Sequence, residues 1–428
     1  MTSRTHTIDA REIAVRVLTR VLRDQAFASA SLDAELSKHG QLDGRDRGLA
    51  TELVYGTLRT YRSLLAELSK FASKGLPEDD VGFIAPLVVA AYQVLLLDRV
   101  PPSAAVNAGV SQITRSRGKA MAGFANALLR KLGRGTLTRE AAVWGNVPEW
   151  LRADLERAIG PEQARALVGA GGESIAVGLR LKHGETLEVS SDFASSPLVP
   201  GALRYLGAGD PRRLPAYRAG KLAVQEEGAQ LLALALSGRA GERIWDACAG
   251  RGQKTTLLAE CVNAGDLWAS DLYPNKLEAL AREVQRLGLP AAHTRALDLT
   301  QGVGDLPTDF DRVLVDAPCT GSGTLRRRPE ILLRLQPEDP ARLGQLAEQI
   351  VRTAARCVKP GGRLVFSVCS VLPEECEAVV QRLADILVPV AFDAPVVTQL
   401  FGEGTTAFRL LTGTHGTDGY FAASLRRH

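Results

Sequence analysis

Two cysteines in the C-terminal half of the chain lie in segments that favour covalent chemistry. Cys319 lies in VDAPCTGSG and Cys369 lies in LVFSVCSVLPEE, and each follows an apolar run that predicts a buried strand. In a doubly wound sheet these two strands are neighbours, so both thiols reach the same edge. A thiolate there could add to carbon 6 of a cytosine, which makes carbon 5 nucleophilic enough to accept a methyl group.

The attacking group in such chemistry must be a thiolate. At an ordinary pKa of about 8.5, only a few per cent of a cysteine is ionised near neutrality. A nearby helix N-terminus or Lys254 could raise that fraction. Asp316, at the end of the strand before Cys319, could in its protonated form donate to ring nitrogen 3 of the base. The spacing alone does not decide which of the two cysteines attacks.

The elements that must position these thiols alternate between strand and helix from residue 238 onward. The strand candidates are ERIWDACAG, DLWASDL, HTRALDL, FDRVLVDAP and GGRLVFSVCS. The helix candidates between them are KTTLLAECVN, NKLEALAREVQRLG and ARLGQLAEQIVRTAARCVK. This alternation predicts an α/β Rossmann-like domain with a doubly wound, mostly parallel sheet, whose ligands bind beyond the carboxyl ends of the strands.

A nucleotide site is predicted at the same edge. The loop from Ala249 to Lys254 is rich in small residues and precedes a helix N-terminus, but Gln253 excludes a Walker phosphate loop. Asp271 ends the second strand, where a carboxylate can take both ribose hydroxyls of a nucleoside. Asp298 ends the third strand and could reach the adenine, and Asp316 ends the fourth. Helix capping is the alternative role for each aspartate.

The N-terminal third predicts a different architecture. Apolar residues at helical spacing over residues 9–140 indicate an all-helical bundle, with IAPLVVAAYQVLLLD as its buried centre. Residues 141–236 mix helical and short apolar segments and predict a small α+β linker domain. We therefore expect domains at 1–140, 141–236 and 237–428.

The bundle carries a basic window that indicates phosphate binding. No acidic residue occurs between Arg99 and Arg139. The basic residues of this window are Arg99, Arg115, Arg117, Lys119, Arg130, Lys131, Arg134 and Arg139. A solvated face is the alternative explanation.

Composition excludes several classes of protein. With 45% hydrophobic and 23% charged residues, the chain is predicted to fold into globular domains. The six cysteines form no C-x-x-C pair and have no histidine at zinc spacing, so we expect reduced thiols and no metal. The sequence shows neither an apolar run of about 20 residues nor a secretory signal, so a cytoplasmic protein without membrane association is expected.

These motifs resemble those of the Sun/Nop2 family of RNA cytosine-5 methyltransferases, and of its RsmB type in particular. VDAPCTGSG resembles the family's D-A-P-C-S-x-x-G motif, and FSVCSVLPEE resembles T-C-S-x-x-x-x-E-N. WDACAGRGQKT resembles the loop D-x-C-A-A-P-G-G-K-T, with Arg251 at the proline and Gln253 at a glycine. The segments GKLAVQEEGAQ and DGYFAASL, and the NusB-like bundle with LVYGTLR, extend the resemblance over nearly the whole chain.

The resemblance implies an enzyme that methylates RNA with S-adenosyl-L-methionine as methyl donor. It implies that Cys369 is the nucleophile and that Cys319 helps to release the product. It places the methyl-donor contacts at Cys248, Ala249, Gly250, Arg251, Gly252, Gln253, Lys254, Asp271, Asp298 and Asp316. The NusB-like domain implies RNA binding, with 16S rRNA as the expected substrate and a monomer as the expected state.

Other functions compete with this interpretation. A DNA cytosine methyltransferase would attack with the Pro-Cys cysteine and leave Cys369 without a role. A nicotinamide-dependent oxidoreductase would use the glycine loop and Asp271 but not the cysteine pair. A transfer-RNA substrate, or a non-catalytic RNA-binding or ribosome-assembly factor that keeps the fold, also stays open.

Overall fold

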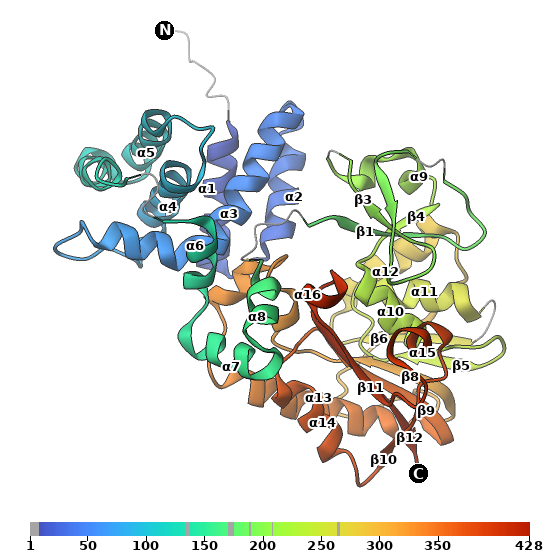
Figure 1. Ribbon diagram of the computed structural model, residues 1–428. Coiled ribbons are helices and arrows are strands. Elements are labelled where there is room, and N and C mark those ends of the chain that lie inside the picture. The colour runs from blue at the N-terminus through green and yellow to red at the C-terminus, as the bar shows by residue number, and fades with distance from the viewer. Residues whose placement is uncertain (1–7, 134–136, 170–174, 188–189, 208, 263–265) are drawn as a thin grey trace. The chain divides into compact units, whose positions relative to one another are not determined.

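The computed structural model describes residues 8–133, 137–169, 175–187, 190–207, 209–262 and 266–428. The chain divides into two compact units (Figure 1). The first comprises Met1–Ala153, Ala164–Glu173 and Leu325–Leu335, and the second comprises Asp154–Gln163, Ser174–Thr324 and Gln336–His428. Each unit is described below by itself.

The first unit is helical, as the sequence predicts. Its helices are α1 (Ala10–Asp24), α2 (Ala28–Lys38), α3 (Gly44–Ser69), α4 (Val81–Leu96), α5 (Pro102–Leu129) and α6 (Arg139–Asn146), and the boundary between the units falls within α7 (Glu149–Ile159) and α8 (Pro161–Val168). The sequence pattern did not single out α2. Gly118 has φ 83°, a value that favours glycine, and it divides α5 into the two helical pieces that the sequence predicts.

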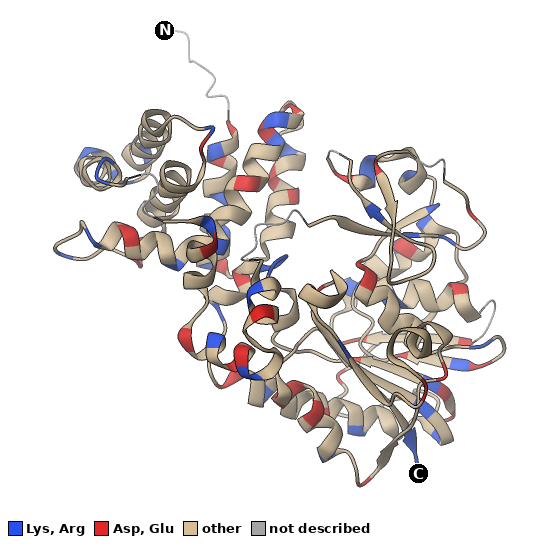
Figure 2. Cartoon of the chain, in the orientation of Figure 1, with Lys and Arg blue, Asp and Glu red and all other residues tan. Residues whose placement is uncertain are grey.

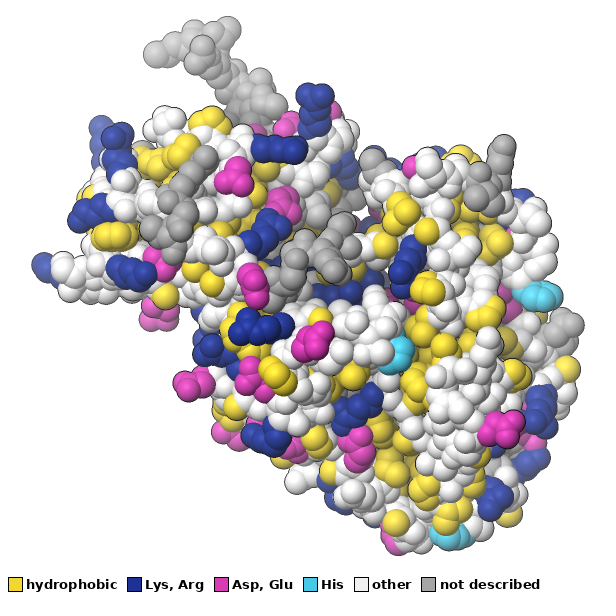
Figure 3. Space-filling view, viewed as in Figure 1, with side chains coloured by type: hydrophobic (Ala, Val, Ile, Leu, Met, Phe, Trp, Pro, Cys, Tyr) yellow, Lys and Arg dark blue, Asp and Glu magenta, His cyan; other side chains and the backbone are white. Residues whose placement is uncertain are grey.

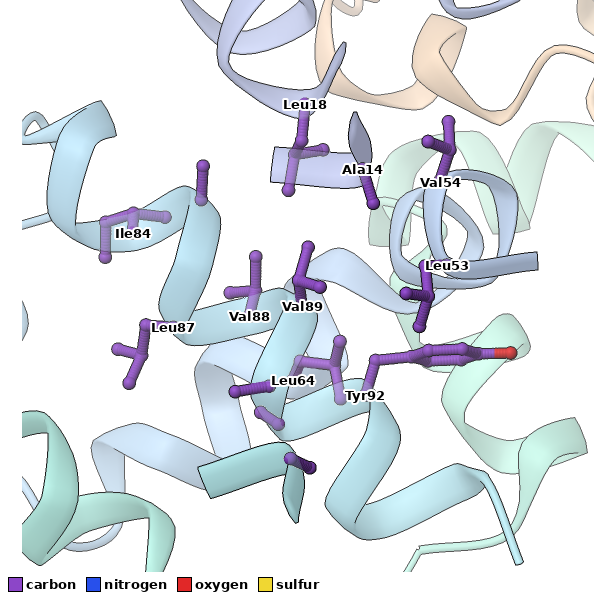
Figure 4. Packing of buried hydrophobic residues seen from close by; sticks show 14 of the residues in the cluster. Ala14, Leu18, Leu53, Val54, Leu64, Ile84, Leu87, Val88, Val89 and Tyr92 are labelled. Atoms are coloured by element: carbon purple, nitrogen blue, oxygen red, sulfur yellow. The ribbon is translucent and has the colours of Figure 1, made fainter. Parts of the chain in front are cut away.

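The core of this unit surrounds α4, which is buried along nearly its whole length. Figure 4 shows Leu87, Val88 and Val89 of α4 among side chains from α1 and α3. The hydroxyl of Tyr92 donates to Glu52 Oε1 over 2.5 Å, so the one polar atom of this aromatic side chain is satisfied. The prediction that this helix is the buried centre of the bundle is confirmed.

The segment Leu325–Leu335 belongs to the helical unit although it follows the Cys319 loop in the sequence. It includes the short 3₁₀ turn η3 (Pro329–Leu333). The Arg59 guanidinium donates to the carbonyl oxygen of Arg326 over 2.9 Å, and Glu330 accepts from the backbone N–H of Ala28 over 3.3 Å. No sequence pattern predicts this pairing.

The second unit holds an eight-stranded sheet with the order β10-β12-β9-β8-β5-β6-β7, and β11 pairs with β12. Its strands are β5 (Arg243–Asp246), β6 (Asp266–Asp271), β7 (His293–Ala296), β8 (Phe310–Asp316), β9 (Val358–Val368), β10 (Leu387–Pro389), β11 (Ala407–Leu410) and β12 (Tyr420–Arg427). The strands from β5 to β9 pair in parallel, and β10, β11 and β12 pair antiparallel. The predicted Rossmann-like, mostly parallel sheet is confirmed.

Helices cover both faces of this sheet (Figure 1). Both faces need a cover because the apolar side chains of β8 point alternately to each of them. Val313 and Val315 pack on one face with α13 (Asp339–Ala355) and α14 (Glu377–Arg382), and Leu314 packs on the other face. That other face is covered by α10 (Glu227–Ala235), α11 (Gln253–Val262), α12 (Pro274–Leu287) and α15 (Pro395–Phe401). The remaining short helical elements are η1 (Pro211–Arg213), α9 (Pro215–Arg218), η2 (Ser322–Thr324), η4 (Pro373–Glu375) and α16 (Thr412–His415).

A smaller antiparallel sheet precedes the large one, with the order β2-β3-β1-β4. Its strands are β1 (Val177–Leu181), β2 (Phe193–Ser195), β3 (Ala202–Tyr205) and β4 (Leu222–Val224). It belongs to the second unit, whereas α6 belongs to the first, so residues 141–236 are divided between the units. The domain boundaries at 140 and 236 stay a prediction. Over the described residues, no helix has the length and apolar character that a membrane span needs.

Candidate active site

The carboxyl ends of four neighbouring strands carry polar side chains. β5 ends in Asp246, β6 in Asp271 and β8 in Asp316, and Cys369 follows the last residue of β9. Because parallel strands end at the same edge of a sheet, the order β9-β8-β5-β6 brings these residues onto one edge. The predicted adjacency of the strands before Cys319 and Cys369 is confirmed by the pairing of β8 with β9.

The two cysteines are in direct contact. The distance between Cys319 Sγ and Cys369 Sγ is 3.3 Å, and both side chains are partly exposed. The hydrogen bond with Cys369, together with burial, raises the pKa of the Cys319 thiol well above its usual range. The neutral thiol of Cys319 is therefore favoured, and either sulfur can be the donor in this contact.

Lys254 and Asp316 form an ion pair beside the cysteines. Lys254 Nζ lies 2.6 Å from Asp316 Oδ2, and the hydroxyl of Ser367 donates to Asp316 Oδ1 over 3.1 Å. Burial works to lower the pKa of Lys254, but the attraction of Asp316 outweighs it and raises that pKa. The ammonium group is therefore a fixed positive charge beside Asp316, at the carboxyl end of β8.

The loop after β5 turns sharply because it contains two glycines. Gly250 has φ 57° and Gly252 has φ 85°, both in the region that favours glycine, and a Cβ at Gly252 would lie 2.5 Å from the Leu280 side chain. A Cβ at Gly250 would meet open space, so a ligand can approach this backbone. The loop leads into the N-terminus of α11, whose first N–H groups have no partner within the helix.

Asp271 ties this loop to the next strand. It is buried, and it accepts hydrogen bonds from the backbone N–H of Gly250 over 3.0 Å and of Tyr273 over 2.9 Å. Lys276 Nζ lies 3.1 Å from the same carboxylate. A carboxylate fixed in this way keeps further lone pairs for hydroxyl groups of a ligand.

The two residues that depart from the family motif point away from the loop interior. Arg251 and Gln253 are exposed, and the Gln253 side chain donates to the carbonyl oxygen of Val224 in β4 over 3.2 Å. The conformation of the loop is set by Gly250 and Gly252, which are both retained. The departures therefore change the outer surface of the loop more than the surface available to a ligand.

Two further predicted site residues lie at the edge of this arrangement. Asp298 accepts from the backbone N–H and the hydroxyl of Thr300 over 2.9 and 2.7 Å, which lowers its pKa. These are the contacts of a turn-capping residue, although one carboxylate oxygen keeps its capacity for a ligand. Cys248 is partly exposed, and burial of its sulfur raises its pKa, so it acts as a neutral thiol in the wall of the site.

Sequence reasoning missed two buried carboxylates at this site. Asp246 is 1% exposed, and its Oδ2 accepts from the Thr255 hydroxyl over 2.7 Å. Its Oδ1 has no hydrogen-bond partner among the residues that the structure describes. Burial raises the pKa of Asp246 to about 6. Glu375 is fully buried and contacts the residues that follow both cysteines. The strand-end argument used for Asp271 would also have found Asp246. The glutamate of the motif T-C-S-x-x-x-x-E-N falls on Glu375, but the motif alone assigns this side chain no contact.

The basic window of the helical unit is partly neutralised within the unit. Arg117 pairs with Asp80 over 2.6 Å, and Arg115 and Arg139 also lie beside carboxylates. Arg134 lies outside the described residues. Acidic and basic residues alternate along the helices of this unit (Figure 2). On the face shown in Figure 3, the basic side chains are interspersed with acidic ones and form no continuous basic patch. Fewer of the basic residues of this window are therefore available to bind phosphate than the sequence predicts.

Comparison with known proteins establishes the family. Residues 233–426 match the family described as 16S rRNA methyltransferase RsmB/F, and residues 8–134 match the NusB family. A probable ribosomal RNA small subunit methyltransferase B from Synechocystis is 31% identical, and the match covers 98% of this chain and 100% of that relative. The chain belongs to the RsmB family of methyltransferases. The RsmB-type relative of Klebsiella pneumoniae is also 31% identical, with 98% of each chain covered.

Solved structures agree with the RsmB-type architecture. The crystal structure of PH0851 has a TM-score of 0.82 at 23% identity and covers 98% of this chain and 99% of that one, so the two share a fold. A methyltransferase homologue from Pyrococcus horikoshii has a TM-score of 0.54 at 26% identity, with 67% of this chain and 97% of that one covered. The predicted combination of a NusB-type bundle and a methyltransferase domain is confirmed.

Proposed function

We propose that this RsmB-family protein transfers a methyl group from S-adenosyl-L-methionine to carbon 5 of a cytosine in RNA, with 16S rRNA as the substrate. The observation that carries the proposal is the 3.3 Å contact between the sulfur atoms of Cys319 and Cys369. Two thiols at the ends of adjacent strands suit a reaction in which one sulfur bonds to the base and the other assists its release. The names of the relatives support ribosomal RNA as the substrate.

Cys369 is the proposed nucleophile. Its sulfur forms a bond to carbon 6, the displaced ring electrons move toward nitrogen 3, and carbon 5 becomes nucleophilic. After carbon 5 is methylated, its proton leaves to a base, the electrons return to the bond between carbons 5 and 6, and the Cys369 thiolate is expelled. Cys319 must first lose its own proton to solvent before it can accept the proton from carbon 5. Its raised pKa makes the thiolate formed in this way a strong base for this last step.

Lys254 and Asp316 supply a proton where the ring needs one. The pair holds a proton on Lys254 Nζ, 2.6 Å from Asp316 Oδ2. Nitrogen 3 gains electron density when the sulfur adds to carbon 6, so a proton delivered there stabilises the adduct. The hypothesis from the sequence assigned this role to a protonated Asp316. The ion pair supports a shared role in which Asp316 orients the base and the Lys254 ammonium group is the source of the proton for nitrogen 3.

The residues on the edge of the sheet fit S-adenosyl-L-methionine. When bound, this donor supplies a methyl group on a positively charged sulfur. Buried Asp246 Oδ1, which lacks a hydrogen-bond partner in the described part of the chain, would accept a cationic group, and Asp271 would bind the ribose hydroxyls. The proposed contact residues are those predicted from the sequence, Cys248, Ala249, Gly250, Arg251, Gly252, Gln253, Lys254, Asp271, Asp298 and Asp316, with Asp246 added. Arg251 and Gln253 would contribute backbone atoms, because their side chains are exposed.

The expected RNA is single-stranded or locally opened, because a stacked base cannot meet both a thiol and the methyl donor. The basic segment Arg326–Arg328, just after the Cys319 loop, is a candidate for holding the RNA backbone. Arg326 is 8% exposed, and the Arg328 guanidinium lies 5.0 Å from the ring centre of Phe27, which is 51% exposed. Arg328 and Phe27 are therefore the better candidates for contact with RNA.

The test is methylation of 16S rRNA from a strain that lacks this gene. The purified protein, labelled S-adenosyl-L-methionine and this RNA should yield 5-methylcytosine, and bisulfite sequencing should locate it. Methylation of transfer RNA alone would overturn the substrate. A protein that binds RNA but shows no methyl-donor binding by calorimetry would instead be an assembly factor, and the proposal would be wrong.

A further inference from the structure

A single buried carboxylate touches the residue after each cysteine. Glu375 Oε1 accepts from the backbone N–H of Thr320 over 2.6 Å, and Glu375 Oε2 accepts from the Thr320 hydroxyl over 2.6 Å. Glu375 Oε2 also accepts from the Ser370 hydroxyl over 2.5 Å. Thr320 follows Cys319 and Ser370 follows Cys369, so one side chain bridges the two loops at the positions next to the sulfurs.

The surrounding hydroxyl groups fix the direction of these hydrogen bonds. The Ser370 hydroxyl donates to Glu375, so the Ser322 hydroxyl, 2.9 Å away, must donate to Ser370 Oγ. Ser322 Oγ in turn accepts from the backbone N–H of Val371 over 3.2 Å. This chain of hydrogen bonds ends on the Glu375 carboxylate. Burial raises the pKa of Glu375, whereas its hydrogen bonds from Ser370 and Thr320 act to lower it.

The backbones of the two loops also approach closely. The N–H of Gly323 donates to the carbonyl oxygen of Cys369 over 3.0 Å, and the N–H of Gly419 donates to the carbonyl oxygen of Gly323 over 2.7 Å. A Cβ at Gly323 would clash with Gly419 and with Cys369. These contacts fix the far end of the Cys319 loop, whereas Glu375 fixes the end beside the sulfurs.

We propose that Glu375 is a positioning residue that sets the separation of the Cys319 and Cys369 sulfur atoms through its hydrogen bonds to Thr320 and Ser370. The expected effect on methylation rests on the proposed function, whereas the effect on the distance between the two sulfur atoms does not. A buried carboxylate is costly unless its hydrogen bonds are complete, and three donors surround this one. An apolar side chain would fill the same space but would leave those donors without an acceptor.

The chain offers a graded set of variants. Glu375→Ala removes the bridge. Glu375→Gln keeps its size and the contact with the Thr320 N–H, but it leaves one hydroxyl proton of the Ser322–Ser370 chain without an acceptor. Glu374→Ala is the matched control, because this neighbouring side chain is half-buried and its carboxylate accepts no hydrogen bond in the described part of the chain.

The first measurement is the single-turnover rate of methylation at saturating RNA and methyl donor, together with the dissociation constant of the methyl donor by calorimetry. Misplacement of reacting groups by about 1 Å can cost on the order of 100-fold in rate. We expect Glu375→Ala to slow turnover by about 100-fold, Glu375→Gln by about tenfold or less, and Glu374→Ala not at all. The methyl-donor affinity should stay within about twofold in each variant, which also verifies folding.

The second measurement reports the distance between the sulfurs without any substrate. The oxidant diamide takes two electrons and two protons from a pair of adjacent thiols, which become a disulfide while its N=N bond becomes a hydrazine. Mass spectrometry can follow the Cys319–Cys369 disulfide specifically. Because disulfide geometry is narrow, we expect Glu375→Ala to form it at least about tenfold more slowly than the wild type or Glu374→Ala.

The outcomes separate the two proposals. If Glu375→Ala binds the methyl donor, methylates RNA and forms the disulfide at wild-type rates, Glu375 does not position the cysteines. If the wild type fails to methylate cytosine, the proposed function is wrong, and the disulfide rates still decide the role of Glu375. If Glu375→Ala does not fold, the same measurements on Glu375→Gln decide, and wild-type rates there would overturn the inference.

Discussion

Replacement of Asp246 by asparagine should stabilise the enzyme in the absence of the methyl donor. This carboxyl group is 1% exposed, and within the described ranges of the chain only one of its oxygens has a hydrogen-bond partner, the Thr255 hydroxyl. Burial raises its pKa from 3.8 to about 6. Asparagine has nearly the same shape and can still accept from Thr255, but it places no charge in this environment.

The size and pH dependence of the effect follow from the pKa. Below about pH 4 the carboxyl is protonated in both the folded and the unfolded state, so it costs no stability. As the pH rises from about 4 to 6, the unfolded state loses its proton first, and the wild type becomes progressively less stable. Each unit of difference between the folded and the unfolded pKa corresponds to about 1.4 kcal/mol, so near pH 7 the charged Asp246 lowers the free energy of unfolding by about 3 kcal/mol. This is an upper bound, because the new amide nitrogen also lacks a partner.

The assay is urea unfolding of the wild type and Asp246→Asn at pH 4.5 and 7.5, without methyl donor. Trp245, one of the four tryptophans of the chain, is fully buried and directly precedes Asp246, so it contributes to a fluorescence signal that follows unfolding of this unit. Asp246→Asn should be the more stable protein at pH 7.5, with a smaller difference at pH 4.5. Asp385→Asn is the control, because a hydrogen bond from Arg352 lowers the pKa of exposed Asp385 and should give the opposite sign. If the free energies of unfolding of the wild type and Asp246→Asn differ by the same amount at both pH values, the reasoning is refuted.

The remaining predictions concern the proposed reaction. Cys369→Ala should abolish methylation with little change in methyl-donor affinity, and normal turnover would show that Cys369 is not the nucleophile. Cys319→Ala should accumulate a covalent adduct with RNA, and denaturing gels without a slower band would exclude its role in release. Asp271→Asn should weaken methyl-donor binding by roughly 10- to 100-fold, because hydrogen bonds to a charged group contribute about 1.5–3 kcal/mol; calorimetry measures this. Gln253→Ala should leave that affinity within about threefold, since its side chain contacts Val224 rather than the loop interior.

The sequence predicts this site well wherever regular structure carries the argument. The alternation of apolar strands and amphipathic helices was sufficient to place Asp271, Asp316 and Cys369 on one edge, because parallel strands end together. It could not predict contacts that depend on loop conformation. Glu375 lies six residues beyond Cys369, and its contact with Thr320 exists only because the loops after β8 and β9 fold toward each other.

The same limit applies to the helical unit. The segment Leu325–Leu335 follows a strand–loop motif and would be assigned to the catalytic domain by any periodicity argument, yet it belongs to the first unit. Arg59 and Glu330 hold it there through side-chain contacts with backbone atoms, which leave no pattern in either segment. Polar contacts between distant segments are a consequence of the fold and cannot be read from local spacing.

The charges of the site suggest an order of events in the proposed reaction. Asp246, Asp271 and Asp316 lie on one edge, whereas two ammonium groups pair with them there: Lys254 with Asp316 and Lys276 with Asp271. A surplus of negative charge disfavours a thiolate, and the Asp316 and Glu375 carboxylates add to the raised pKa of Cys319. A cationic methyl donor would offset this surplus, so its binding should favour ionisation of Cys369. Formation of the RNA adduct should therefore depend on the methyl donor or on a cationic analogue that cannot transfer its methyl group. If adduct with Cys319→Ala forms equally fast when the neutral demethylated product replaces the cationic analogue, this electrostatic coupling does not operate.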